Sequence, residues 1–132
     1  MATILLIDDD PPVRHMLEEL FADEHECHTA DRAEQAIELL EFQNYDVVIT
    51  DVSMPGLGGL EVLRRIKQRH AIPVIVISGR ADQYEHAALK MGAFAFFAKP
   101  FPLSALESAV LGAIAKRIPV TVPSSAREHD NY

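Results

Sequence analysis

The sequence has a single cysteine, no long apolar run and no excess of basic residues. Because Cys27 has no partner for a disulfide within the chain, a reducing compartment is favoured, and we expect a cytoplasmic protein. No apolar run approaches the ~18 residues of a membrane span, and Asp8 follows the first apolar run too early for a signal peptide. The net charge of −8 argues against direct binding to nucleic acid, which needs a basic face.

The length of 132 residues suits one domain of ordinary size, large enough to bury a core. Periodic patterning ends near Pro119, where a stretch rich in proline, valine and serine begins. We therefore expect a domain over residues 1–118 and a flexible tail over residues 119–132.

Short apolar runs alternate five times with stretches of helical periodicity. The runs rich in β-branched or aromatic residues predict strands, at 4–7, 25–30, 47–51, 73–79 and 94–98. Apolar residues at helical spacing predict helices, over about 11–23, 31–40, 60–70, 81–91 and 103–114. Because each connection between strands is long enough for a crossover, the pattern predicts an α/β domain with one parallel sheet covered by helices on both faces.

Two local signals refine the helix ends. Asp31, with Glu34 three residues later, resembles a capping box and predicts that the second helix begins with Asp31 as its N-cap. Gly92 predicts a left-handed end to the fourth helix.

Polar residues stand where four of the five predicted strands end. They are Asp8 and Asp9, Asp51, Ser78 and Lys99. Since the carboxyl ends of parallel strands share one edge of the sheet, we expect these side chains to converge there. Taken alone, Asp51 could equally be a loop-capping acid.

Three carboxylates gathered at one place repel each other unless a cation joins them. Oxygen ligands without cysteine or histidine favour Mg²⁺. The amine of Lys99 and the hydroxyl of Ser78, facing the acids across a gap, would complete a pocket for a phosphoryl group. We expect solvent to reach the Asp51 carboxylate in that pocket.

Four segments in this order carry a resemblance to a known family. They are residues 4–10 (ILLIDDD), 49–56 (ITDVSMPG), 77–79 (ISG) and 92–101 (GAFAFFAKPF). With them the chain resembles a receiver domain of the two-component response-regulator family over roughly residues 1–118. The resemblance implies a flavodoxin-like, doubly wound five-stranded sheet in the order 2-1-3-4-5.

The resemblance also implies roles for the acids. Asp51 would be the phosphoacceptor, attacking the phosphoryl group of a phosphohistidine on a partner. Asp8 and Asp9 would bind Mg²⁺ (or Mn²⁺) together with Asp51 and the backbone carbonyl of Ser53. Such a domain catalyses only its own phosphorylation and dephosphorylation, so we expect a signalling phosphoacceptor and not an enzyme acting on a separate substrate.

The remaining implied roles concern the response to phosphorylation. Lys99 would pair with a phosphoryl oxygen, and the hydroxyl of Ser78 would move to bind the phosphoryl group. Phe96 would be the aromatic switch residue that turns inward when Ser78 moves. The peptide bond between Lys99 and Pro100 would be cis.

Several positions depart from the family pattern or vary within it. Gly58-Gly59 stands where many members have Asp-Gly, and Pro102 replaces a common helix-capping residue, so the start of the last helix could shift. Ser53 and Arg80 occupy positions that tune the lifetime of the phosphoryl group in the family. We expect exchanges at Ser53 and Arg80 to change the dephosphorylation rate more than twofold while the fold is kept.

The resemblance implies a sensor histidine kinase or a histidine phosphotransfer protein as donor. Output would pass to an unknown protein through the face formed by the fourth helix, the fifth strand and the fifth helix, with a phosphorylation-dependent homodimer as one possibility. No output domain follows in the sequence, so we expect a stand-alone receiver, acting as a phosphorelay intermediate or an adaptor. The alternative is a receiver fragment of a longer regulator.

Other functional classes fit the residues less well. A phosphatase of the haloacid dehalogenase type needs an acid two residues after its nucleophile, where this chain has Ser53. A flavin-binding module needs a phosphate-binding loop after the first strand, where the acids 8–10 would repel phosphate. A degenerate receiver would lack the acids or Lys99.

Three further features have ordinary structural explanations. His25, Cys27 and His28 resemble zinc ligands only superficially, because Cys27 and His28 point to opposite faces of a strand. Asp10 is expected to act as a loop or helix-cap acid, and the basic run 64–69 as a solvated helix face.

Overall fold

The computed structural model describes residues 1–53 and 59–117. Its single sheet has five parallel strands in the order β2-β1-β3-β4-β5. The strands are β1 (Thr3–Ile7), β2 (Glu26–Ala30), β3 (Val47–Asp51), β4 (Val74–Ser78) and β5 (Ala95–Ala98). The predicted α/β class and the order implied by the family resemblance are both confirmed.

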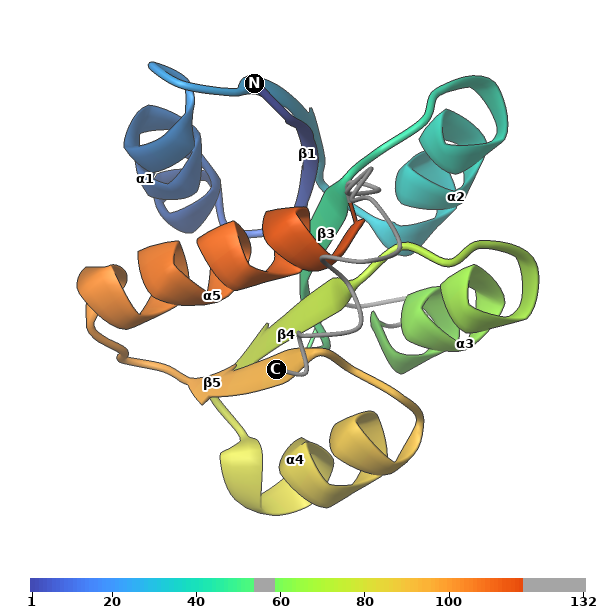
Figure 1. The fold of residues 1–132 in the computed structure, drawn as a ribbon. Coiled ribbons are helices and arrows are strands. Elements are labelled where there is room, and N and C mark those ends of the chain that lie inside the picture. The colour runs from blue at the N-terminus through green and yellow to red at the C-terminus, as the bar shows by residue number, and fades with distance from the viewer. Residues whose placement is uncertain (54–58, 118–132) are drawn as a thin grey trace, which may run out of the picture.

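Five helices connect and follow the strands. They are α1 (Pro11–Phe21), α2 (Ala33–Phe42), α3 (Gly59–Arg69), α4 (Ala81–Lys90) and α5 (Leu103–Arg117). Figure 1 shows α1 and α5 on one face of the sheet and α2, α3 and α4 around the other. Within the part of the chain that the structure describes, every helix is too short or too polar to cross a bilayer.

Each face of the sheet has its own apolar core. Side chains of β1, β3 and β4 that point one way pack against α1 and α5, where Leu17, Leu106 and Val110 are buried. Alternate side chains of the same strands pack against α2, α3 and α4. All residues of β3 and β4 are buried, as their continuous apolar runs predict for central strands of a parallel sheet.

The predicted N-cap of α2 is wrong. The helix begins at Ala33 with Arg32 as its N-cap residue, and no side chain caps it there. The backbone N–H of Asp31 instead donates to Oε1 of Gln35, at 3.0 Å. The capping-box pattern therefore located the start of α2 to within two residues. It predicted that the side chain of Glu34 accepts the backbone N–H of Asp31, but the side chain of Gln35 accepts it.

Other local predictions are confirmed. Gly92 follows α4 with φ of 102°, a left-handed conformation that a side chain would disfavour. The Lys99–Pro100 peptide is cis. The last helix begins at Leu103, directly after Pro102, whose carbonyl accepts the backbone N–H of Ala105 at 3.1 Å. Gly58 and the predicted tail lie outside the described residues.

A candidate phosphoryl and metal site at the carboxyl edge of the sheet

The register of the sheet gathers the polar strand ends. Ile7 pairs with Thr50, Asp51 pairs with Ile77, and Ser78 pairs with Ala98, so β1, β3, β4 and β5 end almost level. Since the chain leaves each strand at this level, Asp8, Asp51, Ser78 and Lys99 lie along one edge, as their positions in the sequence predicted.

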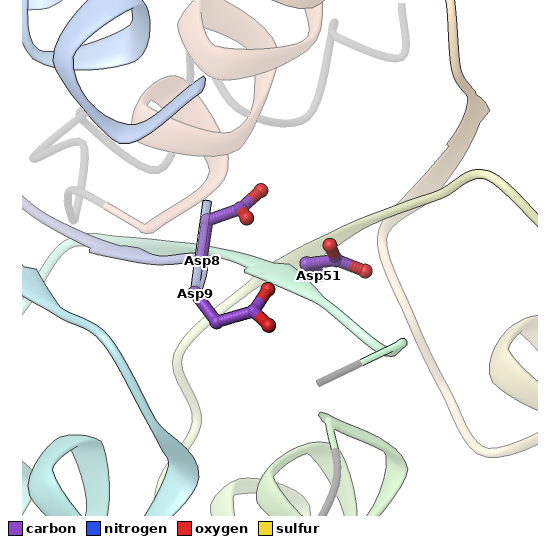
Figure 2. Close-up of side chains that lie close together, drawn as sticks. All are labelled: Asp8, Asp9 and Asp51. Carbon is purple, nitrogen blue, oxygen red and sulfur yellow. The ribbon is translucent and has the colours of Figure 1, made fainter. Parts of the chain in front are cut away.

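The acids form one cluster. Oxygen atoms of Asp8, Asp9 and Asp51 all lie within 4.8 Å of one another (Figure 2). Asp8 is fully buried and Asp9 is exposed. Burial raises the pKa of the Asp8 carboxyl above its ordinary value, and the charge of Asp51 adds to the rise. The cluster is therefore electrostatically costly as long as its charges are not balanced.

Hydrogen bonds fix the directions of the two buried carboxylates. The backbone N–H of Asp10 donates to Oδ1 of Asp8 at 2.9 Å. The backbone N–H of Ser53 donates to Oδ1 of Asp51 at 2.7 Å. These local bonds leave the second oxygen of each carboxylate for Lys99.

The amine of Lys99 bridges the two acids. Its Nζ lies 2.9 Å from Oδ2 of Asp51 and 3.2 Å from Oδ2 of Asp8. Burial alone would lower the pKa of Lys99, but the hydrogen bonds and charges of Asp51 and Asp8 outweigh burial and raise it. The amine therefore stays protonated, and it offsets part of the negative charge of the cluster.

The predicted gap between Lys99 and the acids is not present in this structure. Lys99 touches Asp51 directly, and the side chain of Asp51 is only 5% exposed. The expectation of an open carboxylate is thus wrong for this conformation. Opposite charges at this edge attract each other across a distance that a lysine side chain can span, so a phosphoryl group would have to separate them.

The donor set suits a hard divalent cation. It consists of carboxylate oxygens from two strand ends, and in the described part of the chain no other group of three or more histidine, cysteine or acidic residues is close enough to share a metal ion. The carboxylates of Asp8 and Asp51 are both buried and repel each other, and such a cation would neutralise their negative charge. The geometry supports a divalent metal site and leaves the identity of the metal open.

Arg14 is a site residue that the sequence analysis missed. Its guanidinium donates to the backbone carbonyl of Asp8 at 2.8 Å, which ties the first turn of α1 to the end of β1. In the sequence, an arginine that binds a nearby backbone carbonyl looks the same as an arginine whose side chain is solvated. Only the folded backbone brings the carbonyl of Asp8 within its reach.

Ser78 is buried at the end of β4 and is held by two neighbours. The backbone N–H of Arg80 donates to its Oγ at 2.9 Å, and Oγ of Ser53 lies 3.1 Å away. Phe96 is half-buried in β5 and packs against the core on the α4 side of the sheet. Ser78 ends the strand that pairs with the Asp51 strand, and Phe96 lies on the next strand beyond it. The movement of these two side chains is not tested by this structure.

The zinc alternative finds no support. His28 bonds through Nδ1 to the hydroxyl of Tyr45 at 2.8 Å and through Nε2 to Glu26 at 2.7 Å. Cys27 is half-buried and packs against the core on the α1 side. Asp10 precedes α1 as its N-cap residue without a side-chain capping bond, and it lies outside the acid cluster.

Comparison with known proteins places the chain in a family. Residues 4–111 match the family model described as Response regulator receiver domain. The DNA-binding transcriptional regulator NtrC of Escherichia coli K12 is 34% identical over 115 residues, covering 85% of this chain and 24% of NtrC. The response regulator ArlR of Staphylococcus haemolyticus is 31% identical over 119 residues, covering 89% of this chain and 54% of ArlR.

Solved structures agree with the sequence comparison. A response regulator receiver domain protein from Clostridium thermocellum is similar with a TM-score of 0.79 and 34% identity, covering 88% of this chain and 96% of that one. The response regulator TrrA of Thermotoga maritima, in complex with Mg(2+)-BeF, has a TM-score of 0.77 and 31% identity, covering 86% of this chain and 99% of that one.

The chain therefore belongs to the response regulator receiver domain family of two-component signalling. This membership decides against the haloacid dehalogenase-type phosphatase and the flavin-binding module. The chain spans only about a quarter of NtrC and about half of ArlR.

Proposed function

We propose that this receiver accepts a phosphoryl group on Asp51 and transmits the change to a partner protein. The observation that carries the proposal is the position of Lys99, whose amine contacts both Asp51 and Asp8 beside the three-carboxylate cluster. A buried carboxylate with a cation at 2.9 Å and further acids for a metal is what in-line phosphoryl transfer to an aspartate requires.

In the proposed transfer, a carboxylate oxygen of Asp51 attacks the phosphorus of a phosphohistidine on a sensor kinase or phosphotransfer protein. The new oxygen–phosphorus bond forms as the nitrogen–phosphorus bond breaks, and the electron pair returns to the imidazole. The backbone N–H of Ser53 holds Oδ1 of Asp51, so Oδ2 is the oxygen freed for attack when Lys99 moves to the phosphoryl group. Hydrolysis of the resulting acyl phosphate by water resets the domain.

Asp8, Asp9 and Asp51, with the backbone carbonyl of Ser53, would hold Mg²⁺ or Mn²⁺. When bound, the ion would balance the charge of the acids and of the incoming phosphoryl oxygens. The similar TrrA structure, a complex with Mg(2+)-BeF, supports magnesium as the first ion to test. The role of the chain is to keep Asp8 and Asp51 aimed at one point through the bonds from Asp10 and Ser53.

The acyl phosphate would place about two negative charges beside Ser78 in place of the single charge of the carboxylate, enough to bias a two-state loop. We propose that Ser78 then binds the phosphoryl group and that Phe96 turns inward. The face formed by α4, β5 and α5 would carry the output, either to another protein or to a second copy. Leu89 on α4 and Leu111 on α5 are 46% and 62% exposed, which supports a contact surface there.

The organisation of the natural protein is part of the proposal. A stand-alone receiver would act as a phosphorelay intermediate or an adaptor in the cytoplasm. A receiver within a longer regulator remains the alternative, because the curated relatives NtrC and ArlR are about four and two times as long as the matched part. The intact mass of the protein purified from its source cells distinguishes the two.

Phosphorylation by a small donor tests the proposal. The wild type and Asp51→Asn are incubated with acetyl phosphate and Mg²⁺, and intact mass spectrometry counts the phosphoryl groups. We expect one group on the wild type and none on Asp51→Asn. Asp10→Asn is the matched control, because Asp10 is exposed, adjacent to the cluster and not part of it, and this variant should be labelled. Equal labelling of the wild type and Asp51→Asn would refute the role of Asp51.

A further inference from the structure

The hydroxyl of Ser78 is fully buried, so its hydrogen bonds must be made within the protein. A serine hydroxyl can donate one hydrogen bond and accept two. The backbone N–H of Arg80 fills one acceptor position at 2.9 Å. What remains is the proton of Ser78, which needs an acceptor of its own.

Among the described residues, the acceptor in reach is the side chain of Ser53. Its Oγ lies 3.1 Å from Oγ of Ser78. No hydrogen bond joins Ser78 to Asp51 in the described structure, whose carboxylate is instead bonded to the backbone of Ser53 and to Lys99. Ser53 itself is exposed, so water can satisfy its own hydroxyl proton. In the hydrogen bond between the two hydroxyls, Ser78 is therefore the donor and Ser53 the acceptor.

We propose that the Ser53 side chain is a positioning residue that holds the Ser78 hydroxyl in the resting state. This Ser53–Ser78 bond competes with the phosphoryl group for the single proton of Ser78. The inference rests on the proposed function, since Ser78 must leave Ser53 to bind the phosphoryl group. It gives Ser53 two separate parts: its backbone N–H orients Asp51, and its hydroxyl restrains Ser78.

The bond predicts the direction of a substitution effect. Ser53→Ala removes the acceptor and leaves the backbone N–H to Asp51 in place. Because an ordinary intramolecular hydrogen bond is worth a modest net amount, the resting state should lose about a two- to tenfold advantage. Ligands that recruit Ser78 should then bind more tightly by that factor.

A double-mutant cycle isolates the bond. The probe is beryllofluoride with saturating Mg²⁺, and its dissociation constant is measured by calorimetry for the wild type, Ser53→Ala, Ser78→Ala and the double variant. We expect Ser53→Ala to bind about two- to tenfold more tightly than the wild type. In the Ser78→Ala background, where no hydroxyl is restrained, Ser53→Ala should change nothing. Ser53→Thr keeps a hydroxyl and should restore the weaker binding.

Two controls complete the design. Ser104→Ala changes an exposed serine on α5 and should bind as the wild type does. Unchanged or weaker binding by Ser53→Ala, or the same gain in both backgrounds, would overturn the role of the Ser53 hydroxyl and leave the proposed function intact. A wild type that neither binds beryllofluoride in Mg²⁺ nor takes a phosphoryl group from acetyl phosphate would overturn both.

Discussion

Asp8 is a buried acid in unfavourable surroundings at the carboxyl edge of the sheet. It is fully buried, it lies beside two other carboxylates, and its pKa is raised chiefly by burial. The attraction of Lys99 at 3.2 Å therefore does not outweigh the cost of burying the charge. The folded protein is therefore less stable with Asp8 at this position, and in exchange it holds a cluster of acids that can bind a metal ion.

We expect Asp8→Asn to stabilise the protein in the absence of divalent ions. Removing one buried charge should add about 1 kcal/mol, or a few degrees in Tm for a domain of this size. Mg²⁺ should raise the Tm of the wild type and have little effect on the variant, because a ligand that binds only the folded state stabilises it. Thermal unfolding with EDTA and with Mg²⁺ measures both effects.

Asp10→Asn again serves as the matched control and should keep the response to Mg²⁺. A lower Tm for Asp8→Asn in EDTA, or an equal gain from Mg²⁺ in Asp8→Asn and the wild type, would contradict this account of the acid cluster.

At the scale of an element, α3 shows how charges on one helix are paired. Glu61 in its first turn bonds to Arg64 and to Arg65. The hydrogen bond from Arg64, followed by that from Arg65, lowers the pKa of Glu61 to about 2. The basic residues of this helix are exposed, as predicted, but its arginines form ion pairs. Arg64 and Arg65 pair with Glu61, and Arg69 pairs with Glu41.

The lowered pKa of Glu61 predicts a pH dependence. Between pH about 2 and the ordinary value of 4.5, the unfolded chain binds more protons at this position than the folded one. The stabilisation by Glu61 is therefore present above pH 4.5 and is lost as the pH falls toward 2. Glu61→Gln should have a lower Tm than the wild type near neutral pH, and the difference should shrink in acid.

The effect will be small, because the group is at the surface and salt screens it. Glu34→Gln is the control, since Glu34 lies in the first turn of α2, is exposed and makes no ion pair among the described residues. A carboxyl carbon of Glu61 that titrates near 4.5 by NMR would refute the prediction.

The strands and helices show where sequence patterns suffice. β3 and β4 were predicted well because a strand covered on both faces must be apolar throughout. β2 is an edge strand whose residues are mostly half-buried, so its pattern was weak. The N-cap of α2 was misplaced because the side chain of Gln35, and not that of Glu34, accepts the backbone N–H of Asp31, and the helix begins at Ala33.

At the scale of the whole molecule, the convergence of Asp8, Asp51, Ser78 and Lys99 followed from one property of parallel sheets. The sheet order itself came from the family resemblance, because alternation alone permits several orders. The contact between Lys99 and Asp51, the bond from Arg14 and the Ser53–Ser78 bond depend on side-chain conformations and loop turns. No periodicity in the sequence encodes these.

The proposed output face also belongs to this scale. If phosphorylation drives a homodimer through α4, β5 and α5, beryllofluoride with Mg²⁺ should shift the wild type from monomer to dimer in sedimentation experiments. Leu111→Arg, on the exposed side of α5, should prevent the shift by placing a charge in the interface.

Phe42→Arg provides a matched control for this prediction. Phe42 is 82% exposed but lies at the end of α2, on another side of the molecule, so its substitution should not affect the dimer (Figure 1). A wild type that stays monomeric at high concentration with beryllofluoride bound would contradict the dimer and leave output to a different protein.

The most direct test of the account locates the phosphoryl group itself. After phosphorylation with acetyl phosphate and Mg²⁺, borohydride reduces an acyl phosphate to the alcohol, and peptide mass spectrometry identifies the altered residue. The account predicts that Asp51 is converted to homoserine and that no other acid is changed. Conversion at Asp8 or Asp9 with Asp51 intact, or phosphorylation without any reducible aspartate, would contradict it.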